Sequence, residues 1–259
     1  MLESSQPSFF DAKAATMGAL TAEFAAPPFS VLNAREGWWQ QRKAAWIGLG
    51  IKSEVGRSEN LLSFSKAAAK MGYQKEAKEQ ATSIFDPVLC ELLYRWFCPP
   101  GGQVLDPFAG GSVRGIVASV LGRHYWGCDL SLEQMKENEK QAADICTDLS
   151  CQPHWFPGDA KDLAAGAPLS DFVFSCPPYG SLERYSDDPR DLSTMMPGTF
   201  MESLGQIIAA CYEKLRANRF ACFVVGEYRD QAGVYPNFVG HTVDAFRSVA
   251  SSITTKSSW

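Results

Sequence analysis

The chain has 259 residues, of which 46% are hydrophobic, and this length and composition fit one α/β domain with an additional segment. It contains no apolar run of about 18 residues and no secretory leader, so we expect a cytoplasmic protein without a membrane span. Its net charge of −5 gives no general argument for nucleic-acid binding, although a local basic groove can still neutralise phosphates.

Residues 1–80 are predicted to form an N-terminal extension that is loosely structured in part. Residues 1–30 are rich in Ala, Ser and Pro, whereas residues 64–80 alternate Ala with Lys and Glu and predict a solvated helix. Between these stretches, tryptophans lie among arginines and lysines: Trp38, Trp39 and Trp46. We expect them to pack against the main domain, and the alternative is a basic, aromatic surface that contacts nucleic acid.

A second domain is expected over residues 81–259. Asp86 and Pro87 are typical of a helix start, and Pro99 ends the helix that they begin. From Val104 onwards strands and helices alternate, which favours a doubly wound parallel sheet. We expect strands at 103–107, 124–129, 153–157, 171–175 and 220–226, and helices near 112–121, 132–146, 200–216 and 239–250.

The first expected strand runs into a glycine turn that contains Ala109, Gly110 and Gly111 and opens a helix at Ser112. Glycines let the backbone turn tightly and approach a ligand, and a helix start directs N–H groups towards the same place. The fingerprint GxGxxG is absent, which argues against a nicotinamide or flavin site.

Three expected strands end in an acidic residue. Asp129 is placed to accept hydrogen bonds from ribose hydroxyls, and Asp159, which precedes Ala160, to receive the exocyclic amine of an adenine. With Asp106, these carboxylates match the ribose, ammonium and sulfonium groups of S-adenosylmethionine better than a pyrophosphate. Any one of them can alternatively serve as a turn former.

Two motifs resemble those of the S-adenosylmethionine-dependent DNA amino-methyltransferases. Asp106-Pro107-Phe108-Ala109-Gly110-Gly111-Ser112 resembles their DPF-x-G-(S/G) cofactor motif, and Cys176-Pro177-Pro178-Tyr179 resembles their (D/N/S)-P-P-(Y/F/W) catalytic motif. The segment around Phe85 is similar to the one that precedes the cofactor motif in these enzymes. The resemblance covers about residues 84–228 and is closest to phage or prophage modification enzymes.

This resemblance implies a Rossmann-like methyltransferase sheet, S-adenosylmethionine as cofactor and DNA as partner, in a bacterium or a phage-infected host. No metal is expected, because the eight cysteines include no CxxC pair and no partner His at metal-ligand spacing. It implies cofactor contacts from Phe85, Asp106, Phe108, Ala109, Gly110, Gly111, Ser112, Asp129, Asp159 and Ala160. The implied catalytic residues are Cys176, Pro177, Pro178 and Tyr179. The implied reaction is methyl transfer to N4 of cytosine or N6 of adenine, with the flipped base stacked on Tyr179.

Cys176 stands where the family has Asp, Asn or Ser, and a thiol is a poor hydrogen-bond acceptor. Either the carbonyls of Cys176 and Pro177 suffice, or the reaction is cytosine C5 methylation, in which a thiolate attacks C6. Glu227 would then supply a carboxylate near the base, although the usual Pro-Cys order of C5 enzymes is missing. Ser175 is expected to point to the opposite side of the strand.

The chain ends before the two strands with which the family completes its sheet. We therefore expect a C-terminally truncated domain whose fifth strand has an uncovered edge. A remnant that binds cofactor or DNA without turnover is an alternative function. Residues 181–199 are expected to form a loop over the substrate, with Arg184 and Arg190 as candidate phosphate contacts, or else an ordinary solvated loop.

Overall fold

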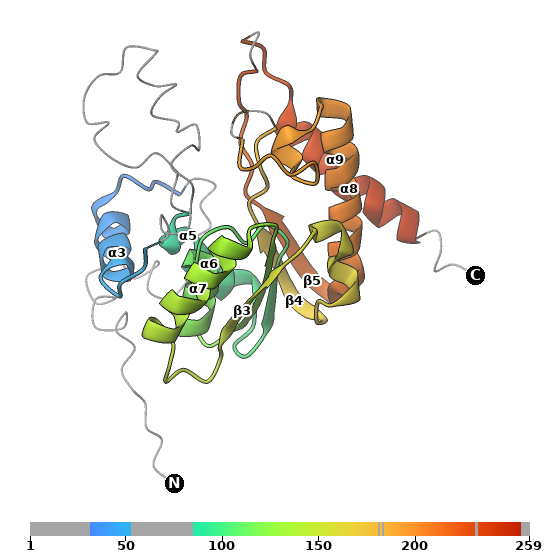
Figure 1. The fold of residues 1–259 in the computed structure, drawn as a ribbon. Coiled ribbons are helices and arrows are strands. Elements are labelled where there is room, and N and C mark those ends of the chain that lie inside the picture. Colours follow the sequence, from blue (N-terminus) through green and yellow to red (C-terminus); the bar gives the residue numbers. More distant parts are fainter. Residues whose placement is uncertain (1–31, 53–84, 181, 183, 231–232, 255–259) are drawn as a thin grey trace.

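The computed structural model describes residues 32–52, 85–180, 182, 184–230 and 233–254 (Figure 1). The expectations for residues 1–30 and 64–80 lie outside this range. The strands are β1 (Gln103–Asp106), β2 (His124–Asp129), β3 (Pro153–Pro157), β4 (Ser170–Ser175) and β5 (Leu215–Phe223). The α-helices are α3 (Gly37–Ile47), α5 (Pro87–Phe97), α6 (Val113–Val120), α7 (Leu132–Ile145), α8 (Pro197–Lys214) and α9 (Phe238–Thr254), and the short 3-10 helices are η1 (Ala160–Ala165) and η2 (Leu192–Thr194).

The sheet has five parallel strands in the order β3-β2-β1-β4-β5. This order confirms the predicted α/β class and its doubly wound, Rossmann-like sheet. The chain proceeds outward from β1 to β2 and β3, and then returns to the other side of β1 to form β4 and β5. Connectivity therefore reverses between β1 and β4. Within the described residues no strand follows β5, so β5 forms an edge of the sheet, as expected.

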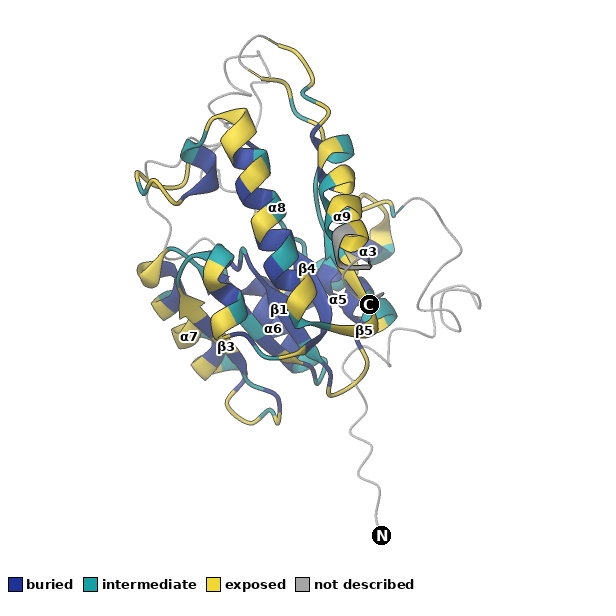
Figure 2. Ribbon diagram, turned by 90° about the vertical axis from the view of Figure 1, so that its right-hand side faces the viewer, coloured by how far each residue is buried: buried dark blue, intermediate teal, exposed yellow. Residues whose placement is uncertain are grey.

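Helices cover both faces of the sheet (Figure 1). Helices α5, α6 and α7 pack on one face around a core that includes Tyr94, Ile116 and Phe172. Helices α8 and α9, with η1, pack on the other face around Leu105 and Ile207. Figure 2 shows the consequence, because the central strands β1 and β4 are buried whereas the outward faces of α8 and α9 are exposed. Within the part of the chain that is described, no helix is both long and apolar enough to cross a membrane.

Strand β5 starts at Leu215, earlier than the predicted residue 220. Its first half lacks an apolar pattern because it is exposed at the sheet edge. The pairing with β4 changes register there, and Asn218 has a positive φ of 57°. Arg216 and Arg219 both pair with Asp171, at 2.7 and 3.1 Å. These polar contacts stabilise a strand segment that hydrophobic alternation alone does not reveal.

Helix α3 is attached to the domain through a buried carboxylate on α5. Glu91 accepts hydrogen bonds from the Arg42 Nε at 2.6 Å and the Trp46 indole at 2.9 Å, and its other neighbour is Arg95 at 3.1 Å. The indole of Trp39 donates to Asp86 at 3.2 Å. Trp39 and Trp46 are buried, so the predicted packing of these tryptophans is confirmed.

Gly115→Ala is expected to lower the free energy of unfolding by about 1–3 kcal/mol. A Cβ atom at Gly115, in α6, would collide with the indole ring of Trp155 on β3. The matched control is Gly205→Ala in α8, where nothing lies within 4 Å of the added Cβ and alanine is expected to favour the helix. Urea unfolding followed by fluorescence measures both variants. Equal effects would contradict the close approach of α6 to β3.

Candidate active site at the reversal point of the sheet

The candidate site lies where connectivity reverses, beyond the carboxyl ends of β1 and β4. The ladder between these strands pairs Val104 with Phe172 and Leu105 with Val173, and the described residues form no further pair beyond it. The glycine turn follows β1 and the Pro-Pro-Tyr segment follows β4. The structure therefore places the two sequence motifs side by side. Ligands of open α/β sheets bind beyond the carboxyl ends of the strands at such a reversal point.

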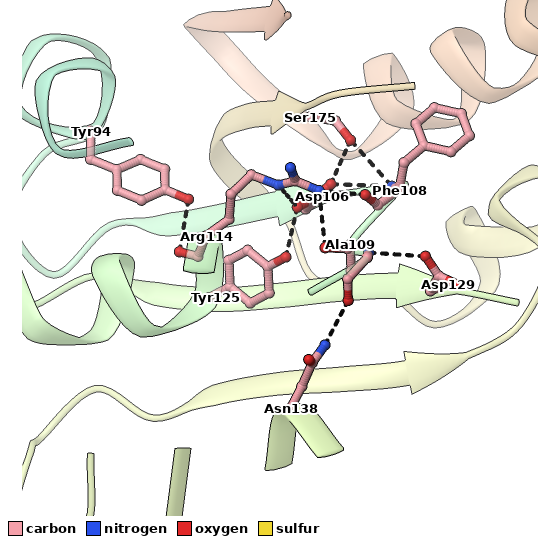
Figure 3. A network of polar contacts seen from close by, with 10 residues as sticks. Tyr94, Asp106, Phe108, Ala109, Arg114, Tyr125, Asp129, Asn138 and Ser175 are labelled. Carbon is pink, nitrogen blue, oxygen red and sulfur yellow. Dashed lines mark hydrogen bonds and ion pairs between the residues drawn. The ribbon is translucent and has the colours of Figure 1, made fainter. Parts of the chain in front are cut away.

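Asp106 is the centre of a buried polar network that joins the two loops (Figure 3). Its Oδ1 accepts hydrogen bonds from the Ser175 hydroxyl at 2.5 Å and the Phe108 N–H at 3.1 Å. Its Oδ2 accepts from the Arg114 Nε at 2.5 Å and the Tyr125 hydroxyl at 2.6 Å. Burial raises the pKa of Tyr125, which keeps this hydroxyl protonated and able to donate.

The network changes the role expected for Asp106. An ionised carboxylate offers about four acceptor positions, and the protein itself supplies donors to all of them. Asp106 is also fully buried, with 0% of its surface exposed. It therefore holds the glycine turn in place and has no oxygen left for a ligand, which corrects the prediction of a direct cofactor contact.

Arg114 was not identified from the sequence, yet it organises the same turn. Its Nη2 donates to the carbonyls of Phe108 at 2.5 Å and Ala109 at 3.0 Å, and its guanidinium lies 4.6 Å from the centroid of the Phe85 ring. Burial lowers the pKa of Arg114, but the groups around it, with Asp106 foremost, together outweigh burial and raise the pKa above the ordinary value. Arg114 is the one charged residue in α6, and such a charge in an apolar helix is a signal that could have identified it.

The glycine turn is held from two further sides. Asp129 Oδ2 accepts a hydrogen bond from the Gly110 N–H at 2.9 Å, and Asn138, buried in α7, donates to the Gly110 carbonyl at 2.7 Å. Gly110 has a φ of 50°, a conformation that favours glycine. Among the described residues, no hydrogen-bond acceptor engages the N–H of Gly111. The Ser112 hydroxyl donates to Gln141 at 3.0 Å rather than capping α6.

Asp129 and Asp159 each bind backbone N–H groups but keep some acceptor capacity. Asp129 accepts one N–H on each oxygen, from Gly110 and from Ser131 at 3.0 Å, and it is half-buried. Burial raises the pKa of Asp129, while these two N–H groups oppose the shift. Asp159 caps η1 through the N–H of Lys161 at 2.9 Å, and the next residue, Ala160, is buried. Each oxygen has a second lone pair, so both can still accept a hydrogen bond from a ligand.

The Pro-Pro-Tyr segment begins directly after β4. The Cys176 thiol is half-buried and lies 3.8 Å from the Tyr179 hydroxyl. The Ser175 hydroxyl lies against Asp106 instead, so neighbouring side chains at this strand end contact different partners, consistent with the expected alternation. Between Cys176 and Tyr179, Pro177 is buried and Pro178 is half-buried. The proline rings fix φ at both positions, which restricts the backbone of this segment.

Tyr179 packs within an aromatic cluster at the base of α9. Its ring lies edge-on to Phe238 at 6.0 Å, and its hydroxyl donates to the Val224 carbonyl at 3.4 Å. Gly180 follows with a φ of 52°, and the Tyr228 hydroxyl fills the space that a Cβ atom would need there. The Tyr179 ring is half-buried, and base stacking on it stays a prediction.

Glu227 lies at the N-terminus of α9. Its two carboxylate oxygens accept the N–H groups of Phe238 at 3.1 Å and Val239 at 3.0 Å, so it caps the start of α9. Each of its oxygens keeps a second lone pair, so the role considered for Glu227 in C5 methylation stays a prediction. Favourable placement of a carboxylate at a helix N-terminus explains its position without any ligand.

The loop between β4 and α8 is anchored to the core in the part that is described. Leu192 is buried, and the buried Asp191 binds the Ser193 N–H at 2.9 Å. The loop arginines lie beside acidic neighbours, Arg184 with Asp187 and Arg190 with Asp188. Their predicted phosphate contacts therefore require these exposed pairs to open, and stay predictions.

No family model matches the chain, and no curated protein sequence is detectably similar. Among solved structures, TrmN from Thermus thermophilus matches with 21% identity and a TM-score of 0.42 over 57% of this chain and 46% of that one. A TehB-like SAM-dependent methyltransferase from Corynebacterium glutamicum matches with 14% identity and a TM-score of 0.43 over 72% and 80%. Magnesium protoporphyrin IX methyltransferase from Synechocystis, with bound SAM, matches with 12% identity and a TM-score of 0.43 over 86% and 87%.

This chain thus spans less than half of the Thermus protein that it matches. At these identities the similarity concerns the fold alone, and folds of this kind host many reactions. Substrate and reaction must be argued from the residues at the site.

Proposed function

We propose that the protein is an S-adenosylmethionine-dependent methyltransferase that transfers a methyl group to the exocyclic amine of a flipped cytosine or adenine in DNA. The observation that carries this proposal is the adjacency of the two motifs at the reversal point of the sheet. The Ser175 hydroxyl joins the cofactor motif, at Asp106, to the start of the catalytic motif. Such an arrangement suits a methyl donor held beside a flat ring.

The hydrogen-bonding groups around the glycine turn fit the proposed cofactor. Asp129 has acceptor capacity for ribose hydroxyls, and the N–H of Gly111 suits a carboxylate. Phe108 is half-buried beside the turn. Asp159 and Ala160 follow β3 and are proposed to contact the adenine. When bound, S-adenosylmethionine supplies an electrophilic methyl group on a sulfonium. The remaining contributions come from the chain itself.

The Pro-Pro-Tyr segment is proposed to orient the target amine. The carbonyls of Cys176 and Pro177 accept hydrogen bonds from the two N–H groups of the amine, which directs the nitrogen lone pair away from them; the one proton that the methylated nitrogen loses passes to solvent. The fixed φ angles of Pro177 and Pro178 hold these carbonyls at a constant spacing. Tyr179 offers a ring face for the base. Restricting the base in this way lowers the entropic cost of the reaction.

One observation favours an amine over C5 of cytosine as the acceptor. The residue directly before Cys176 is Ser175, so the Pro-Cys order that C5 enzymes use is missing. The decisive experiment is nucleoside mass spectrometry of DNA from cells that express the protein. N4-methylcytosine or N6-methyladenine supports the proposal, and 5-methylcytosine contradicts it. Binding of S-adenosylhomocysteine without any mark identifies a non-catalytic remnant.

Cys176→Ser is expected to retain methyl transfer within about tenfold of the wild-type rate, because the carbonyls rather than the thiol orient the amine. Transfer to an oligonucleotide from radiolabelled S-adenosylmethionine measures this rate. Cys222→Ser, at the other half-buried cysteine, is the matched control. Complete loss with Cys176→Ser, together with a covalent adduct on a mechanism-based cytosine analogue, would establish C5 chemistry.

A further inference from the structure

The two halves of the site are joined by side chains at the place where backbone pairing has ended. The last paired residues of β1 and β4 are Leu105 and Val173. Beyond them the Ser175 hydroxyl donates to Asp106 at 2.5 Å and accepts the N–H of Phe108 at 3.2 Å. We call this pair of hydrogen bonds the Ser175 bridge. It joins the loop that follows β1 to the end of β4.

The Ser175 bridge is held firmly at both ends. Asp106 is fixed by Arg114 and Tyr125, as Figure 3 shows. Ser175 itself is fully buried, and its carbonyl accepts the N–H of Val224 at 2.8 Å, which ties it to the end of β5. The glycine turn, Ser175 and the adjoining Cys176 are therefore connected through these hydrogen bonds.

We infer that Ser175 is a positioning residue that sets the spacing between the cofactor turn and the Pro-Pro-Tyr segment. This inference rests on the proposed function and extends it, since the hydroxyl contacts neither the methyl donor nor the base. Without the bridge, each loop keeps its own remaining contacts, but their relative position is less restricted. Methyl transfer depends on that relative position, whereas binding of either ligand depends mainly on one loop.

The test uses the labelling rates of the two half-buried thiols, Cys176 and Cys222, with iodoacetamide and peptide mass spectrometry. In the ligand-free full-length protein, Ser175→Ala is expected to raise the labelling rate of Cys176 relative to Cys222 by about fivefold or more. The matched control is Ser119→Ala, another buried serine whose hydroxyl donates to the Cys151 carbonyl. Ser119→Ala should leave the ratio of Cys176 to Cys222 labelling unchanged. Ser175→Thr keeps the hydroxyl and should therefore show the wild-type ratio.

Catalysis supplies the second readout. Ser175→Ala is expected to lower kcat by about 10- to 100-fold, while the Kd of S-adenosylhomocysteine stays within about threefold. In the wild-type protein S-adenosylhomocysteine should slow labelling of Cys176, and this effect should shrink in Ser175→Ala. An equal rise in labelling of both cysteines would show a merely structural role and overturn the inference. An unchanged ratio would also overturn it.

The failure of the proposed function is distinguishable from the failure of this inference. If the wild-type protein does not bind S-adenosylhomocysteine, the proposed function is wrong. The ratio of Cys176 to Cys222 labelling in the ligand-free protein still tests the Ser175 bridge in that case. If Ser175→Ala does not fold, the effect of S-adenosylhomocysteine on Cys176 labelling in the wild-type protein tests the inference instead. Bound S-adenosylhomocysteine that leaves the Cys176 labelling rate unaltered then contradicts the coupling.

Discussion

Arg114→Met is expected to destabilise the protein by about 3–5 kcal/mol, because it leaves the Asp106 carboxylate buried without its cation. Arg114 is 5% exposed and Asp106 is 0% exposed, so water cannot replace the lost partner. The substitution also removes the donors to the carbonyls of Phe108 and Ala109. Chemical denaturation followed by tryptophan fluorescence and far-UV circular dichroism measures the change.

A double-mutant cycle separates the ion pair from the rest of this effect. Combining Arg114→Met with Asp106→Asn removes the unpaired charge, so the double variant should be more stable than the sum of the two single effects implies. Arg219→Met, which breaks a partly exposed pair with Asp171, is the control and should cost about 1 kcal/mol or less. Additive effects at Arg114 and Asp106 would show that the two side chains do not depend on each other.

Asp129→Ala is expected to weaken S-adenosylhomocysteine binding by about 100-fold, since hydrogen bonds to a charged acceptor contribute about 1.5–3 kcal/mol each. The substitution also frees the Gly110 N–H, which loosens the glycine turn. Isothermal titration calorimetry provides the affinity. Asp144→Ala, an exposed acidic position in α7, should leave it unaltered. A change of less than about threefold with Asp129→Ala would remove this residue from the proposed ribose contact.

The sheet was predictable where local pattern and burial agree. Strand β2 spans His124–Asp129 and β3 spans Pro153–Pro157, as predicted, because each combines apolar residues with clear turn signals. The start of α5 was also predictable, since Asp86 accepts the Val88 N–H and Pro87 needs no such bond. The first half of β5 was not, because exposed polar contacts stabilise it.

The site was predictable in its placement but not in its roles. Parallel strands bring their carboxyl ends to one edge of the sheet, so the two motifs were expected to meet. The partners of Asp106 depend on tertiary contacts: Ser175 lies 69 residues away and Tyr125 lies 19 residues away in sequence. A local sequence pattern does not show contacts between residues so far apart in the chain. Asp106 was therefore predicted to contact the cofactor, although its carboxylate is buried and holds the glycine turn.

The junction between α3 and α5 has a consequence for how this chain can vary. Glu91 is fully buried and holds Arg42 and Trp46 through side-chain hydrogen bonds, so its carboxylate is the acceptor that fastens α3 to α5. Loss of this carboxylate leaves the Arg42 guanidinium and the Trp46 indole without that acceptor, in a place that water does not reach. A substitution at Glu91 is therefore expected to persist only with compensating changes at Arg42 and Trp46.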